Sequence, residues 1–179
     1  MAKRKHDIHS SVVAYWGLME SRSAGANGGP VFKGLTGNGH DGHFFGDLTY
    51  RSVAFRTDGA PLVFDGGRKR VFIADDLAFQ LTDSLTIEAY IAVDRYPSAQ
   101  ANMAQIVFRG DDRPGHDPWF LAITTSGKLR FLIADDNGLA SVLESPDPIP
   151  MGPLLHVAAM LDHHSGTQTL LVNHQPVAT

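Results

Sequence analysis

The sequence predicts an all-β protein, an antiparallel two-sheet sandwich, from three observations. Short segments rich in β-branched and aromatic residues recur along the 179 residues, and turn-forming residues separate nearly all of them. Within residues 81–91 (LTDSLTIEAYI), apolar side chains recur at alternate positions, which is typical of a strand with one buried face. No segment has the pattern of a convincing helix. The lack of helices between strands argues against an α/β enzyme fold.

The predicted strands follow one another at short spacing. Residues 120–125 and 128–133 alternate on either side of Ser126 and Gly127, which makes them the clearest hairpin in the sequence. Residues 21–43 are rich in glycine and asparagine and are predicted to form a long loop. Strands are expected at residues 11–18, 43–45, 60–64, 70–73, 84–93, 105–108, 119–124, 128–134, 140–144, 154–161 and 167–172.

Aromatic residues in or next to these strands are predicted to pack between the two sheets. Large rings bury much apolar area, so core packing is their default role in a sandwich. The residues concerned are Tyr15, Trp16, Phe55, Phe64, Phe72, Tyr90, Phe108 and Phe131.

Composition excludes several classes of function. The formal net charge is −4 and the basic residues gather mainly at residues 3–5 and 68–70, so no nucleic-acid partner is expected. No apolar run approaches the length of a membrane span. The chain has no cysteine, which removes disulfides, thiolate metal sites and a cysteine nucleophile. The basic residues 1–7 precede no apolar stretch long enough for an export signal.

The length suits one domain, expected over residues 11–179 after an extension at residues 1–10. Residues 170–179 (LLVNHQPVAT) are predicted to form a strand, a turn and the start of a return strand. A natural domain rarely ends in the middle of a hairpin. The sequence therefore favours an excised part of a longer exported protein, lacking the C-terminal strands of its domain.

Short phrases that occur in one order along the chain carry a resemblance to a known family. The phrases are AYWGL at 14–18, GNGHDG at 37–42, FDG at 64–66, LTIEAY at 85–90, HVAA at 156–159 and LVN at 171–173. In this order and spacing they resemble the laminin G-like domains of bacterial surface proteins, within the concanavalin A-like lectin/glucanase superfamily. The resemblance spans about residues 12–179 and implies a jelly-roll sandwich.

The resemblance implies a non-catalytic recognition module of a larger exported or envelope protein, placed outside the cell, on its surface or in the periplasm. The expected ligand is a carbohydrate or a protein surface, bound by loops at one rim or by the concave sheet face. Two alternatives stay open. One is a glycoside hydrolase or its accessory domain, and the other is an architectural spacer that contacts other domains of a parent chain.

Calcium is a candidate cofactor, because many laminin G-like domains bind it. The glycine-rich loop supplies Asn38 and Asp41, and Glu20 follows the first predicted strand, so these oxygens could form a cage for a hard cation. Gly34 stands where relatives often have an acidic residue. The alternative interpretation is that Asn38 and Asp41 form turns by bonding to their own backbone.

A polar loop beside a tryptophan is the candidate ligand site. Sugar-binding sites often combine an aromatic platform with planar polar groups. The alternative is that the tryptophan starts a core strand while the neighbouring acids and arginines pair at the surface. The candidate residues are Arg109, Asp111, Asp112, Arg113, His116 and Trp119.

The histidines do not predict a transition-metal site. His40 and His43 would face opposite sides of a strand, and nothing in the sequence brings them close to His163 and His164. These four side chains are therefore predicted to be exposed to solvent.

The carboxylates do not predict catalysis. Glucanases of the superfamily place their acidic residues at alternate positions of one strand, whereas Glu88 is alone in its strand. The adjacent aspartates at 75–76, 111–112 and 135–136 have diverging side chains in extended structure and are predicted to lie in turns at strand ends. The sequence therefore predicts no catalytic site.

Overall fold

In a computed structural model of the protein, the residues described are 12–18, 31–47, 49, 62–67, 69–80, 83–110, 118–135 and 137–179. The chain divides into two compact units, residues 1–80 and residues 81–179, and each is described by itself. The predicted extension at residues 1–10 lies outside the described residues. In the described part of the chain, no helix is long and apolar enough to cross a membrane.

The unit of residues 1–80 holds a three-stranded antiparallel sheet in the order β1-β2-β3. Alternation along β2 buries Phe44 and leaves His43 and Phe45 exposed. A short 3-10 helix follows, and Asp76 caps it by accepting a hydrogen bond from Ala78 N at 2.8 Å. The elements are β1 (Val31–Phe32), β2 (Gly42–Phe45), β3 (Arg70–Ile73) and η1 (Leu77–Phe79).

Several predictions for this unit are wrong. Residues 12–18 form no strand, and Trp16 makes only an isolated antiparallel bridge with Gly34. The described residues 62–64 form no extended strand, and the predicted loop at 21–43 contains β1 and the first residues of β2. A strand of two residues such as β1 leaves too short an alternating pattern to be recognised in a glycine-rich sequence. The predicted strands at residues 43–45 and 70–73 are confirmed as β2 and β3.

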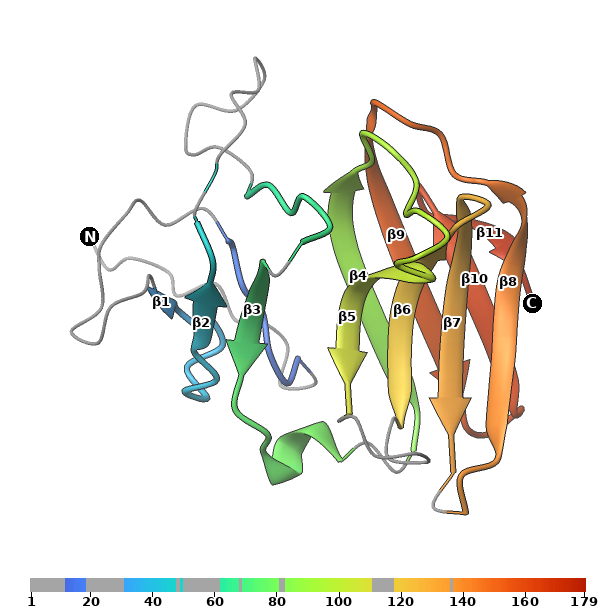
Figure 1. Cartoon of the computed structure of the whole chain (residues 1–179). Coiled ribbons are helices and arrows are strands. Elements are labelled where there is room, and N and C mark those ends of the chain that lie inside the picture. The colour runs from blue at the N-terminus through green and yellow to red at the C-terminus, as the bar shows by residue number, and fades with distance from the viewer. Residues whose placement is uncertain are drawn as a thin grey trace, which may run out of the picture. The chain divides into compact units, whose positions relative to one another are not determined.

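The unit of residues 81–179 is a sandwich of two four-stranded antiparallel sheets, in the orders β5-β6-β7-β8 and β11-β10-β9-β4 (Figure 1). This confirms the predicted all-β antiparallel sandwich, which is consistent with a jelly roll. The predicted return strand is present as β11. The strands are β4 (Leu85–Ala92), β5 (Met103–Arg109), β6 (Trp119–Thr124), β7 (Lys128–Ala134), β8 (Ala140–Pro148), β9 (Leu154–Asp162), β10 (Thr167–Val172) and β11 (Gln175–Ala178).

The core of this sandwich comes from the alternation along its strands. In β4, Leu85 and Ile87 are buried, while Thr86 between them and Glu88 after them are exposed. Burying one such aliphatic side chain contributes roughly 1.5–3 kcal/mol. The largest fully buried side chains of the core are Leu121, Leu129, Phe131, Val157 and Leu170, which come from both sheets.

The prediction that the aromatic residues fill the core is mostly wrong. Phe131 is fully buried and Trp16 is partly buried, whereas Phe55 lies outside the described residues. Being aromatic does not by itself place a residue in the core, because its position in the alternating pattern of its strand also matters. In β4 the aliphatic face turns inward, so Tyr90 is exposed with Glu88. The exposed members, with exposed fractions between 38% and 68%, are Tyr15, Phe64, Phe72, Tyr90 and Phe108.

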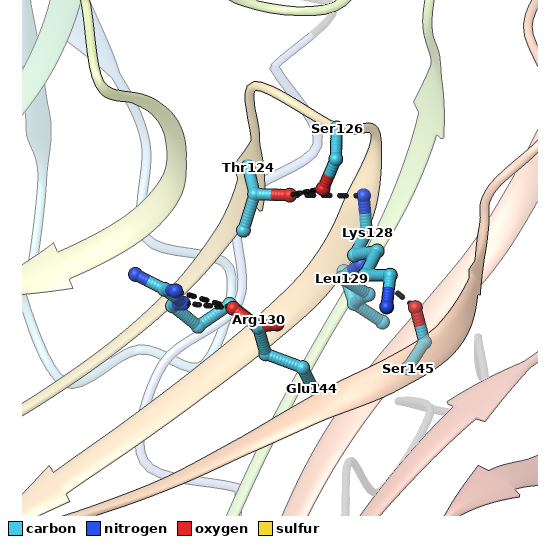
Figure 2. Close-up of polar contacts among 7 residues, drawn as sticks. All are labelled: Thr124, Ser126, Lys128, Leu129, Arg130, Glu144 and Ser145. Atoms are coloured by element: carbon cyan, nitrogen blue, oxygen red, sulfur yellow. Dashed lines mark hydrogen bonds and ion pairs between the residues drawn. The ribbon is translucent and has the colours of Figure 1, made fainter.

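The hairpin between β6 and β7 is confirmed at the predicted turn (Figure 2). Thr124 Oγ1 lies 2.9 Å from Ser126 Oγ and accepts a hydrogen bond from Lys128 N at 3.1 Å. Gly127 has a φ of +80°, in the left-handed region that favours glycine. On the neighbouring strand β8, Ser145 Oγ accepts a hydrogen bond from Leu129 N at 3.0 Å. These contacts fix the hairpin against β8.

Candidate functional site

An apolar row crosses the outer face of the sheet β5-β6-β7-β8. Phe108 pairs with Phe120, Phe120 with Leu132, and Leu132 with Val142, so the side chains of all four project to one face. Their neighbours along the strands, such as Phe131, pack in the core. The four residues, named the outer row below, therefore point away from the core. Phe108 is 38% exposed and Val142 is 50% exposed at the two ends of the row, whereas Phe120 between them is buried, at 7%.

A planar ion pair lies on the same face as the outer row. Arg130 and Glu144 are register partners on β7 and β8, and both Nε and Nη2 of Arg130 contact Oε1 of Glu144 (Figure 2). About a third of each side chain is exposed, at 34% and 32%. The opposite charges of the two side chains offset each other. The pairing also orients the rest of the Arg130 guanidinium group and the second carboxylate oxygen of Glu144. The face thus combines apolar area with fixed, neutralised polar groups.

The predicted ligand loop is only partly described. Arg109 and Trp119 are register partners at the ends of β5 and β6. Trp119 packs against the core, and its Nε1 is buried without a hydrogen-bond partner among the described residues. This supports the interpretation of Trp119 as the start of a core strand. The other candidates, Asp111, Asp112, Arg113 and His116, lie outside the described residues, so the ligand loop stays a prediction.

The candidate calcium ligand Asp41 is engaged with protein groups. Lys33 Nζ lies 2.5 Å from Asp41 Oδ2, and Gly34 N donates a hydrogen bond to Asp41 Oδ1 at 3.0 Å. The hydrogen bond from Lys33, followed by the one from Gly34, lowers the pKa of Asp41. These contacts favour a role for Asp41 in fixing the loop.

Asn38 is also engaged, because its Nδ2 donates a hydrogen bond to the carbonyl oxygen of Val13 at 2.9 Å. The third candidate, Glu20, lies outside the described residues. In the part of the chain that the structure describes, no group of three His, Cys, Asp or Glu residues could hold a metal ion. The calcium site therefore stays a prediction.

One histidine differs from its predicted environment. His40 is only 8% exposed, its ring centroid lies 4.6 Å from that of Phe79, and its carbonyl oxygen accepts a hydrogen bond from Trp16 Nε1 at 2.5 Å. The expectation that it is exposed is wrong, because aromatic packing within the unit of residues 1–80 covers it. His43, His163 and His164 are exposed, as predicted.

A side-chain cluster around Glu88 was not predicted from the sequence. Glu88 Oε2 lies 3.3 Å from His156 Nε2. The His156 ring centroid lies 5.1 Å from that of Tyr90 and 4.3 Å from the stacked ring of His174. His156 N also donates a hydrogen bond to Asn173 Oδ1 at 3.1 Å. Only the pairing of β4 with β9 brings Glu88 and His156 together, since they are 68 positions apart.

Residues 65–179 match the laminin G family model of the concanavalin A-like lectin/glucanases superfamily, and this match covers more than half of the chain. The chain belongs to this superfamily. A laminin G-like domain agrees with the resemblance expected from the sequence phrases. The search of curated proteins found no match to this chain.

A solved structure supports the fold of this laminin G-like domain. It is the crystal structure of an S-layer domain-containing protein (residues 221–444) from Clostridium thermocellum ATCC 27405. The similarity has a TM-score of 0.56 and 20% sequence identity, and covers 92% of this chain and 70% of that chain. At this identity the similarity shows the fold alone.

The two strand glutamates of this laminin G-like domain cannot act as a glycosidase pair. Glu88 projects outward from β4, and Glu144 projects outward from β8 in the opposite sheet. Packed sheets lie about 10 Å apart, whereas a retaining glycosidase holds its two carboxyl groups about 5 Å apart.

Asp135 lies in a turn as predicted and accepts hydrogen bonds from Asn137 N at 2.9 Å and Leu139 N at 2.8 Å.

Acid is expected to destabilise the unit of residues 81–179. The hydrogen bond from Leu139 N lowers the pKa of Asp135, and the Ser165 hydroxyl, followed by His164 N, lowers that of Asp162. Each folded-state pKa lies below the unfolded value of about 3.9, so the contribution to stability is present above that pH and is lost as the pH falls through the folded pKa.

Urea unfolding between about pH 5 and pH 2 measures this effect. Ser165→Ala removes the largest cause of the lowered pKa of Asp162 and is expected to make the loss of stability in acid shallower. An unchanged acid dependence in this variant would contradict the assignment.

Proposed function

We propose that this laminin G-like domain is a non-catalytic recognition module of a larger exported or envelope protein, and that it binds glycan on the outer face of sheet β5-β6-β7-β8. Membership of the lectin/glucanase superfamily supports a binding fold. The similar solved structure comes from an S-layer domain-containing protein, and this likeness supports a place at the cell surface.

The observation that carries the glycan proposal is the outer row beside the Arg130–Glu144 pair. A sugar ring has an apolar C–H face that stacks on aromatic and aliphatic side chains, and hydroxyl groups at its edge that both donate and accept. Phe108 offers the exposed ring, and Arg130 with Glu144 offers planar donors and an acceptor. Because the pair is neutralised, a neutral sugar is a better match than an acidic one.

Glycan-array binding followed by calorimetry on the best ligand tests this proposal. Arg130→Lys keeps the charge but loses the planar contact with Glu144, and is expected to weaken binding about tenfold, since charge-assisted bonds contribute about 1.5–3 kcal/mol. Phe108→Ala is expected to weaken it as well. Lys128→Arg, on the same strand, is the control and is expected to bind normally.

Different results support the other functions. Release of reducing sugar by the protein, lost in Glu88→Gln, would overturn the non-catalytic assignment and support a glycoside hydrolase. Failure to bind any glycan, with folding confirmed by circular dichroism, would overturn glycan recognition and support the architectural spacer.

The calcium proposal has its own test. A calcium ion held by Asn38 and Asp41 would take the place of the Lys33 ammonium at Asp41, so the two cations compete. Lys33→Met is therefore expected to raise calcium affinity, and Asp41→Asn is expected to abolish it. Calorimetry with calcium chloride measures both variants. Absence of calcium-dependent heat in the original chain and in Lys33→Met would refute the calcium prediction.

A further inference from the structure

The outer face of the opposite sheet carries a second set of side chains. In β4 and β9, Tyr90 is the register partner of His156, and Glu88 is the partner of Ala158. All project away from the core, whose residues on these strands include Ile87 and Val157. We name the patch formed by Glu88, Tyr90, His156 and His174 the acidic face.

The acidic face has negative charge and no lysine or arginine on its strands. The strands β4, β9, β10 and β11 contain no lysine or arginine, and their acidic residues are Glu88 and Asp162. The Glu88 side chain is 68% exposed and its contact with His156 Nε2, at 3.3 Å, is long for a hydrogen bond. A carboxylate is therefore presented to solvent on this face.

A group of aromatic rings lies beside this carboxylate, and His156 is the ring that contacts it. Tyr90 is 68% exposed, and its ring lies at 57° to that of His156, which is in turn stacked on His174. The His156 ring is 8% exposed, and its Nδ1 is buried without a hydrogen-bond partner among the described residues. Aromatic faces carry negative charge density and attract cations, as does the carboxylate.

Exposed apolar side chains flank the cluster on the same face. Leu154 and Met160 alternate with the inward residues of β9, and they are 41% and 40% exposed. Leu154 and Met160 can contact the side-chain methylene groups and the neighbouring residues of a bound cationic peptide. A small inorganic cation has no such groups.

We propose that the acidic face docks a partner protein through an arginine side chain of that partner. The guanidinium would pair with Glu88 and stack on Tyr90, while residues next to the arginine contact Leu154 and Met160. This site is on the opposite sheet from the Arg130–Glu144 pair, so it is independent of glycan binding.

The test measures the binding of a capped pentapeptide to the full chain by two-dimensional ¹⁵N NMR. The peptide has arginine at its centre and a leucine on either side of it. Shift changes are expected at residues 86–90 and 154–160. Glu88→Gln and Tyr90→Leu are each expected to weaken peptide binding about fivefold. The leucine keeps an apolar side chain on the strand, and Asp83→Asn, which removes one exposed negative charge elsewhere, is expected to bind normally.

Three results would overturn the proposal. The first is the absence of shift changes on β4 and β9 at millimolar peptide. The second is an equal loss of affinity in Asp83→Asn and Glu88→Gln, which would indicate unspecific attraction to a negative protein. The third is spermine binding as tightly as the peptide at the same residues, which would indicate a polyamine site.

Discussion

Replacing Phe131 with alanine is expected to lower the free energy of unfolding of the unit of residues 81–179 by about 3–5 kcal/mol. Phe131 is fully buried between the sheets and packs in the core with Leu121, its register partner on β6. The loss combines the apolar area returned to water with a cavity that the two sheets cannot close. Urea unfolding followed by tryptophan fluorescence or circular dichroism measures it.

Phe108→Ala is the matched control for this change. The same side chain is removed from β5 of the same sheet, where it is 38% exposed on the outer row. A solvent-exposed ring leaves no closed cavity, so the expected loss is about 1 kcal/mol. Equal losses in the two variants would contradict the assignment of inner and outer faces to this sheet.

Replacing Gly127 with alanine is expected to cost about 3 kcal/mol, for two reasons that add. Gly127 has a φ of +80°, a conformation that strains any L side chain. A Cβ at this position would also lie 2.6 Å from Cε1 and Cε2 of Tyr96, inside van der Waals contact. The Tyr96 ring cannot easily move away, because its hydroxyl donates a hydrogen bond to Ile149 O at 2.8 Å.

Two variants separate these reasons, with thermal unfolding as the measurement. Gly166 has a φ of +66°, and an added Cβ would meet no atom within 4 Å, so Gly166→Ala is expected to cost about 1 kcal/mol. In a Tyr96→Ala background, the further cost of Gly127→Ala is expected to fall to the same value. If Gly127→Ala destabilised the Tyr96→Ala variant as much as it destabilises the original chain, contact with Tyr96 would not be the source of the loss.

Strand length explains why prediction succeeded for nearly all of one unit and for only part of the other. In the unit of residues 81–179, alternating strands of four to nine residues with glycine turns made nearly every strand recognisable, and the hairpin at Ser126 and Gly127 is where it was predicted. In the unit of residues 1–80, β1 has two residues and lies within a glycine-rich segment, so local pattern carried too little information.

The candidate sites depended even more on long-range pairing. Arg130 and Glu144 are not a recognisable motif, and they meet because β7 and β8 pair in one register. Glu88 looked isolated in its strand until β9 placed His156 beside it. A sequence shows the face that a residue shares with its own neighbours, whereas the residue across the strand boundary follows from sheet order and register.

Local pattern was enough to establish the fold class, the family resemblance, most strands of the sandwich and the lack of a glucanase phrase around Glu88. Tertiary packing alone decided the environment of other residues, and it exposed Phe108 while burying His40. In β4 the alternation itself places Tyr90 on the face of Thr86 and Glu88, whereas β6 is apolar at nearly every position, so local sequence does not distinguish its two faces. Packing distinguishes them, because the face that best fills the space between the sheets is the one that forms the core.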